Sequence, residues 1–308
     1  MIKWLKYILA LIIIAFLLFY LAAHWQDLRI MLKLGPAQLA LICLLLFLSV
    51  LLNARIVQYL TAALGTATAF GDMVALHHVA LLLNYAPMKL GTFFRADYLK
   101  RHYGLSYTGF ASFFLYVTFL TSAVAALTGL IVLLAFYGLK GYEGRILAAA
   151  FALTVAVSLS FLLVPLPLPK GEGLIKETLK KFLAGRRQIS KEKKTIFTIA
   201  AISAATFILT AIRLAVIYNS MGKNIRPAGL LILGTLDFVV VLASLTPGSL
   251  GIREIVLGSS AVVLGVPLEV GILAAMIDRA VLIGYVFIAG GICASRLRSK
   301  YPADFKKE

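Results

Sequence analysis

The amino-acid sequence predicts an all-α polytopic membrane protein, with about six transmembrane helices and two re-entrant or broken helical hairpins arranged as an inverted repeat. Of its 308 residues, 61% are hydrophobic and only 14% are charged. The hydrophobic residues form blocks about as long as the roughly 20-residue helix that crosses a bilayer core of about 30 Å. A short Pro-Gly pattern also recurs in two interrupted blocks. These features are incompatible with a soluble domain.

Six apolar blocks have the length of a membrane span. The first follows a charged start and could instead be a cleaved export signal ending at Ala22-Ala23. We favour a retained span, because its apolar run is longer than a typical signal core and the later spans need the orientation that it sets. The predicted spans are 7–23, 37–60, 107–137, 144–164, 195–221 and 268–294.

The formal net charge of +17 has the distribution that membrane topology requires. Between residues 165 and 194, nine lysines and arginines outnumber three glutamates, which predicts a cytoplasmic loop. The first residues and the tail are also basic, so both termini are expected in the cytoplasm and the protein in the cell membrane. Orientation and attraction to anionic headgroups explain this charge better than binding to nucleic acid does.

The predicted units follow from the spans and the basic loop. Within that loop, residues 174–187 place apolar residues at helical spacing with lysines opposite, which predicts an amphipathic helix on the inner leaflet. The units are a first half with linker spans at 1–164, the basic loop at 165–194, a second half at 195–294 and a basic tail at 295–308.

Two stretches, 71–102 and 228–265, are apolar but interrupted. The arm 71–86 is too short to cross comfortably, and the residues after Pro87 carry charges that cannot face lipid. We therefore expect 71–102 to enter from the cytoplasm and return there, because a full crossing would place the basic loop outside. The second stretch begins and ends outside, either as a re-entrant hairpin or as two full spans.

The interrupted stretches share the pattern Pro-x-x-Leu-Gly, at 87–91 and 247–251. The same shift of 160 residues overlays 37–60 on the fifth span and 107–134 on the sixth. An odd number of intervening spans makes the copies upside down relative to each other, an architecture that recurs in transporters. Because proline removes a donor and glycine permits sharp turns, the predicted gates or helix breaks are Pro87, Gly91, Pro247, Gly248 and Gly251.

Charged residues occur within these apolar stretches, where each unpaired charge costs at least about 2.5–3.5 kcal/mol. Such residues persist when they form ion pairs or face water. Pairing of Asp237 or Glu254 with Arg279, and snorkelling of Arg55 and Arg95 to the membrane edge, are the structural alternatives to a site. Basic members outnumber acidic ones, which suits a phosphate-bearing ligand. The candidate pathway residues are Arg55, Lys89, Arg95, Asp97, Arg213, Asp237, Arg253, Glu254, Asp278 and Arg279.

No catalytic motif, nucleotide-binding loop or metal-ligand spacing occurs in the sequence. We therefore expect no cofactor, no metal and no self-contained hydrolase activity. His77 and His78 are adjacent and point to different helix faces; a proton relay is one interpretation, and ordinary buried or interface histidines are the favoured one.

Two segments resemble the signatures of a known family. TPGSLGIRE at 246–254, with Gly265-Val266 and Asp278-Arg279 further on, resembles the second signature of the transmembrane region of lysylphosphatidylglycerol synthases, and APMKLGTFFRADYLKRHYGLS at 86–106 resembles the first. The resemblance covers almost the whole chain and implies a lipid-translocating membrane region. It also implies a standalone form, because the residues after Arg296 are too few for the soluble synthase domain. Tyr116 and Thr118 stand where the resemblance implies charged residues.

The resulting functional hypothesis is a lipid translocase that moves the headgroup of a phospholipid, an aminoacylated lipid or a polyprenyl-phosphate carrier through a polar groove. The alternatives are a membrane-embedded transferase, or a subunit of one, acting on lipid-linked sugars, and a non-transporting scaffold. The expected partners are membrane lipids, with a homo-oligomer or a soluble cytoplasmic enzyme as further possibilities.

Overall fold

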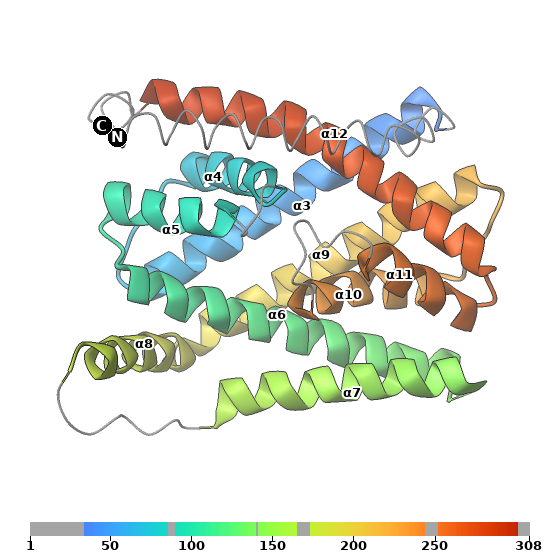
Figure 1. The fold of residues 1–308 in the computed structure, drawn as a ribbon, viewed down its shortest axis with the longest axis horizontal. Coiled ribbons are helices and arrows are strands. Elements are labelled where there is room, and N and C mark those ends of the chain that lie inside the picture. The colour runs from blue at the N-terminus through green and yellow to red at the C-terminus, as the bar shows by residue number, and fades with distance from the viewer. Residues whose placement is uncertain (1–33, 86–89, 140, 165–172, 244–251, 301–308) are drawn as a thin grey trace.

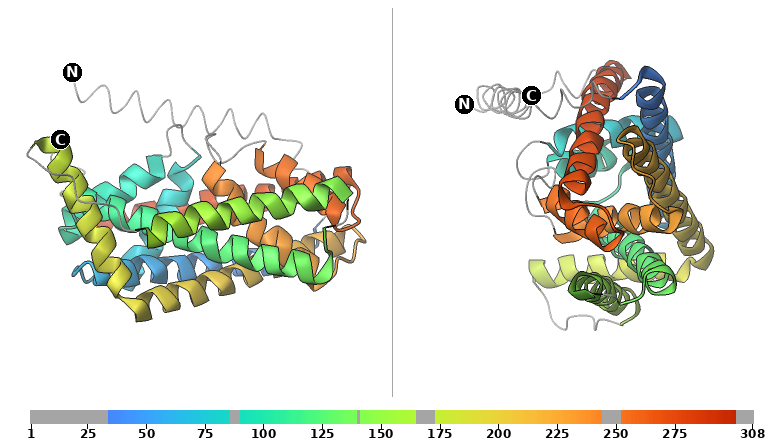
Figure 2. Two further views of the ribbon diagram at one scale, coloured as in Figure 1. Left: turned by 90° about the horizontal axis from the view of Figure 1, so that it is seen from below. Right: turned by 90° about the vertical axis from the view of Figure 1, so that its right-hand side faces the viewer.

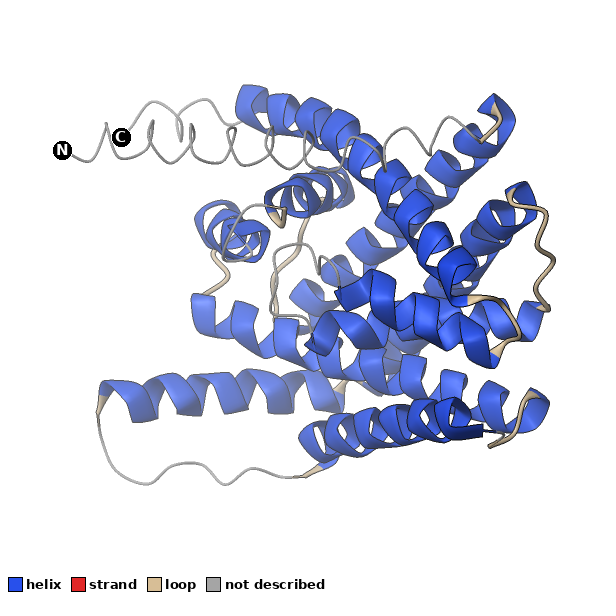
Figure 3. Ribbon diagram, turned by 45° about the vertical axis from the view of Figure 1, so that its right-hand side comes forward, coloured by secondary structure: helices blue, strands red, loops and turns tan. Residues whose placement is uncertain are grey.

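A computed structural model describes residues 34–85, 90–139, 141–164, 173–243 and 252–300, and every regular element in these ranges is an α-helix. The fold class is thus confirmed (Figures 1 and 3). The predicted span 7–23, the tail from 301 onwards, Pro87, Lys89, and the stretch 244–251 with Pro247, Gly248 and Gly251 lie outside the described residues.

Five described helices are long and apolar enough to cross a membrane: α3 (Pro36–Ala63), α6 (Tyr107–Phe136), α7 (Gly141–Leu163), α9 (Lys193–Ser220) and α12 (Leu268–Lys300). Each coincides closely with a block predicted from composition. Many of their large apolar side chains are exposed on the outside of the bundle, as expected for helices that contact lipid. The protein is therefore a multi-pass membrane protein.

The two interrupted stretches each fold into a pair of short helices. The first contains α4 (Phe70–Leu83) and α5 (Leu90–Tyr103), and the second contains α10 (Pro227–Ala243) and α11 (Ile252–Val263). None of the four reaches the roughly 20 residues that a perpendicular crossing requires. Gly91 lies inside α5, not at a turn, and a Cβ there would approach the backbone oxygen of Ala80 to 1.9 Å. Close packing of α5 on α4 therefore requires this glycine.

The helices α3–α6 and α9–α12 follow the same order of long, short, short and long. Their lengths are 28, 14, 14 and 30 residues in the first set and 28, 17, 12 and 33 in the second. Figure 1 shows that α3 and α9 run in opposite directions, as do α6 and α12. Packing is also reciprocal, because α4 lies on α12 while its counterpart α10 lies on α6. An inverted duplication would produce this arrangement.

The basic loop contains a helix, α8 (Leu174–Lys191), that lies at one end of the bundle (Figure 2). Its Leu183 and Ile189 are buried, whereas most of its lysines are exposed. The Ser112 hydroxyl of α6 donates to the Phe182 carbonyl at 2.8 Å, and the buried Arg186 donates to the Val164 carbonyl at 2.8 Å. These bonds fix α8 against the ends of α6 and α7.

The contact between α4 and α12 generates a test of the packing. Gly290 of α12 faces α4, where an added Cβ would lie 2.9 Å from Leu82 Cβ and 3.2 Å from the His78 backbone oxygen, whereas Gly291 faces open space. Overpacking of this kind costs about 1–3 kcal/mol. We expect Gly290→Ala to lower the free energy of unfolding in detergent by this amount. Gly291→Ala, the matched control, should be neutral or slightly stabilising because alanine favours the helix. Equal effects of the two substitutions would contradict the α4–α12 contact.

Candidate functional site

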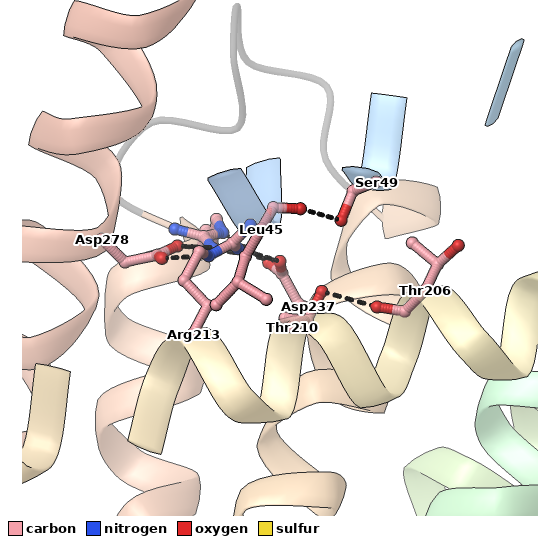
Figure 4. A network of polar contacts seen from close by, with 8 residues as sticks. Leu45, Ser49, Thr206, Thr210, Arg213, Asp237 and Asp278 are labelled. Carbon is pink, nitrogen blue, oxygen red and sulfur yellow. Dashed lines mark hydrogen bonds and ion pairs between the residues drawn. The ribbon is translucent and has the colours of Figure 1, made fainter. Parts of the chain in front are cut away.

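Four charged side chains from four helices of the second half meet in one cluster, and Figure 4 labels three of them, Arg213, Asp237 and Asp278. Arg213 of α9 binds Asp278 of α12 through both carboxylate oxygens, with Nε–Oδ1 at 2.6 Å and Nη2–Oδ2 at 3.2 Å. Arg253 of α11 donates to the same carboxylate at 2.6 Å, and it also binds Asp237 of α10. The sequence-predicted pathway residues Arg213, Asp237, Arg253 and Asp278 are therefore brought together.

This cluster is buried and formally neutral. Asp278 is fully buried, Arg213 and Arg253 are 5% and 6% exposed, and the side chain of Asp237 is 16% exposed. Two guanidinium groups and two carboxylates cancel one another, so no net charge is left in the interior. Removing one partner of such a buried pair costs about 3–5 kcal/mol, because it leaves the other charge uncompensated.

One arginine nitrogen remains unused. Arg253 Nη1 is buried and has no hydrogen-bond partner among the described residues. A buried guanidinium N–H without an acceptor is costly, so this donor is available to an incoming acceptor such as a phosphate oxygen. Arg253 lies in the first turn of α11, which is the second of the two short helices in the stretch 228–265.

A second ion pair lies next along the same helices, where Glu254 of α11 pairs with Arg279 of α12. This is one of the pairings that the sequence suggested. Tyr85, the buried residue two positions after α4, is close enough to interact electrostatically with Arg253, Glu254, Asp278 and Arg279. The described residue that follows α4 therefore lies near the ionic cluster of the second half.

The first half contains a related but uncompensated arrangement. Arg95 of α5 lies beside His77 of α4, with Nη2 3.4 Å from the ring Nδ1. Its Nε is buried and has no hydrogen-bond partner in the part of the chain that the structure describes. His77 corresponds to Asp237 at the 160-residue shift, whereas Arg95 corresponds to Ile255 and not to Arg253. Each half therefore places an arginine beside this aligned position, but from a different position in the helix after the interruption.

Two predicted site residues lie elsewhere. Arg55 is exposed on α3, where it bonds to Gln58 at 2.6 Å and lies over the ring of Phe70. Asp97 forms a partly exposed ion pair with Arg101 at 2.8 Å.

Two polar contacts were not predicted from the sequence. The buried His78 bonds to Tyr285 Oη at 2.8 Å and so links α4 to α12, and Tyr103 Oη donates to the buried Asp72 at 2.7 Å. An isolated tyrosine in an apolar segment carries no local pattern, so only the helix packing reveals these partners. No described group of three or more His, Cys, Asp or Glu side chains is arranged to hold a metal ion.

The cluster generates a test of its own. Asp278→Asn would leave two buried arginines sharing only Asp237, so we expect the free energy of unfolding in detergent to fall by about 3–5 kcal/mol. Asp97→Asn removes the same charge from a pair that is partly exposed and should cost less than about 1 kcal/mol. Similar losses in the two variants would show that the buried network contributes no special stability.

Comparison with protein families identifies the chain. The family model of the lysylphosphatidylglycerol synthase TM region matches residues 7–290, which include both interrupted stretches and the ionic cluster. Comparison with curated proteins and with solved structures gives no match. The match covers most of the chain, in agreement with the resemblance carried by 86–106 and 246–254. The protein therefore belongs to the family of lysylphosphatidylglycerol synthase transmembrane regions.

Proposed function

We propose that this protein is a lipid translocase, which moves a phosphate-bearing headgroup across the bilayer between its two halves while the acyl or prenyl chains remain in lipid. The proposal rests on unused hydrogen-bond donors of two arginines, one in each helix that follows an interruption. Arg95 and Arg253 each keep a buried N–H donor without a partner among the described residues. Phosphate oxygens are strong acceptors for guanidinium groups.

The two arginines would have different roles. Arg253 is already neutralised by Asp237 and Asp278, so it offers a hydrogen bond with little net charge. Among the described residues, Arg95 has only the neighbouring histidine ring at 3.4 Å as a polar partner, so it offers a positive charge that no described carboxylate neutralises. A headgroup phosphate would therefore bind more strongly near Arg95.

Backbone interruptions at membrane depth support the same function. Non-helical backbone in a bilayer is tolerated where it is buried in protein or lines a water-filled cavity. Tyr85 and the ionic cluster of α11 and α12 lie within electrostatic range of each other, so described residues beside the two interruptions are neighbours. In this proposal the segments around Pro87 and Pro247 act as gates, opening the headgroup path alternately to the two sides.

The inverted arrangement supplies the two conformations that translocation requires. Because α4 packs on α12 and α10 packs on α6, each short-helix pair is held by a long helix of the other half. A rocking motion of one half against the other would exchange two related states, as in other proteins built from inverted repeats. The basic loop and both termini are placed in the cytoplasm in this proposal.

The direct test is lipid movement in proteoliposomes, measured with a panel of fluorescent lipids and leaflet-selective quenching. Loss of a charge-assisted hydrogen bond worth about 1.5–3 kcal/mol corresponds to roughly a 10- to 100-fold effect. We therefore expect Arg95→Gln to slow translocation of phosphate-bearing lipids by at least about tenfold. Arg55→Gln, which removes an exposed arginine, is the matched control and should retain the wild-type rate. Unchanged translocation by Arg95→Gln at wild-type protein levels would refute the proposed role of this residue.

A further inference from the structure

His77 and Arg95 meet between the two short helices of the first half. Gly91 of α5 packs on α4 at Ala80, where there is no room for a Cβ. Arg95 lies one turn further along α5 and His77 one turn earlier on α4, and residues three or four apart share a helix face. The guanidinium Nη2 therefore lies 3.4 Å from His77 Nδ1. Both residues remain partly exposed, so the pair is not sealed inside the protein.

This contact determines the protonation state of His77. A guanidinium group has N–H donors and no acceptor, so Arg95 is the donor and Nδ1 is the unprotonated nitrogen of the ring. The histidine is therefore neutral in the structure. A hydrogen bond of 3.4 Å is long and weak, whereas a phosphate oxygen is a strong acceptor for guanidinium. When Arg95 turns to a phosphate, the lone pair on Nδ1 becomes free to bind a proton.

The adjacent His78 is not suited to this role. Its Nδ1 lies 2.9 Å from the carbonyl oxygen of Val74, and its Nε2 lies 2.8 Å from Tyr285 Oη. Because a carbonyl oxygen only accepts, Nδ1 carries the hydrogen and Nε2 accepts from Tyr285. A second proton on this ring would break the bond that links α4 to α12. The contacts thus separate two histidines that the sequence could not tell apart.

The charges around His77 leave its protonation to be controlled by a ligand. Arg95 of α5 and His78 of α4 itself act on it electrostatically, and a neighbouring cation disfavours a second positive charge. An anion bound at Arg95 reverses this effect. Other described titratable groups approach α4 elsewhere along its length: Tyr285 at His78, with Cys43 and Cys293 near Tyr285, Arg296 near Gly71, and Tyr103 at Asp72.

We propose that His77 couples headgroup binding to the uptake of one proton, so that the protein moves a lipid phosphate and a proton together. As a phosphate oxygen accepts from Arg95, a proton from the water on the loading side binds Nδ1 of His77. When the phosphate is released on the opposite side, the proton returns to water there and Arg95 donates to Nδ1 again. This inference rests on the proposed translocase function and names its driving force, a proton gradient.

Charge balance favours such coupling. A singly charged headgroup that crosses alone works with or against the membrane potential, whereas a phosphate and a proton together are neutral. The empty site holds the charge of Arg95. The loaded site adds one negative phosphate and one protonated imidazole, so its net charge is the same. In the second half Arg253 is instead bound to the carboxylates of Asp237 and Asp278, which offer no comparable exchange of a neutral base for a phosphate.

The test uses the full chain in well-buffered proteoliposomes that contain trace acyl-labelled fluorescent phosphatidylglycerol in both leaflets. This lipid is a phosphodiester, so it carries a single negative charge at every pH used. A pH difference of one unit is imposed, the membrane potential is clamped at zero with valinomycin and equal potassium, and the leaflet distribution at equilibrium is read by leaflet-selective quenching. Coupling to one proton should enrich the lipid about tenfold in the leaflet facing the alkaline side. An equilibrium distribution does not depend on the orientation of the reconstituted protein.

The variants assign the coupling to one residue. His77→Gln keeps an acceptor for Arg95 but binds no proton, so it should move the lipid more slowly and lose the enrichment; His77→Asn, a second neutral replacement, should do the same. His102→Gln is the matched control, because His102 lies in the last turn of α5 against the ring of Tyr98. It should retain the tenfold enrichment.

The outcomes separate this coupling from the translocase function. A wild-type protein that moves the lipid without enriching it would overturn the coupling and leave the translocase proposal standing. Enrichment by His77→Gln equal to that of the wild type would overturn the role of His77. If the wild type moves no lipid at any pH, the translocase proposal fails, and the coupling fails with it.

Discussion

The structure depends on one constraint: charged side chains and interrupted backbone within a bilayer must find partners, because lipid supplies none. In the second half the constraint is met by ion pairs that join α9, α10, α11 and α12. The bonds of α10 and α11 to Arg213 and Asp278 therefore fix the second interrupted stretch against the two long helices that flank it.

The first half meets the same constraint differently. Its α4 packs on α12 with the His78–Tyr285 hydrogen bond and the close approach at Gly290. Among the described residues of this half, the partly buried Arg95 lies beside His77, whereas the second half has a carboxylate, Asp237, at the position aligned with His77. The two halves thus share a plan and differ in charge: one is internally neutral and structural, and the other retains a positive charge for which the proposed ligand is a phosphate. In this view the divergence between the repeats produces the function.

Much of the architecture follows from composition, because apolar blocks of bilayer length can only be spanning helices. The short helix pairs were also predicted, since Pro-x-x-Leu-Gly interrupts both blocks and charges follow each interruption. Which charged residues form ion pairs with one another was harder to predict from the sequence. The sequence suggested Glu254 with Arg279, which the structure has, but the sharing of Asp278 between Arg213 and Arg253 depends on how four helices converge. Arg55 and Asp97 were selected for the same reason, as charged residues within apolar stretches. In the structure, however, Arg55 is exposed and Asp97 is partly exposed.

The proposed headgroup path requires water to reach the protein interior beside Arg95. Water access is measured most directly by thiol labelling in proteoliposomes with a membrane-impermeant maleimide, after Cys43 and Cys293 have been replaced by alanine. A cysteine at His77 should react from at least one side of the membrane, whereas a cysteine at Leu134, which is 49% exposed on the apolar surface of α6, should not react. If the cysteine at His77 is sealed from both sides while one at the loop residue Asn224 reacts, the interior is dry and the proposed headgroup path does not exist.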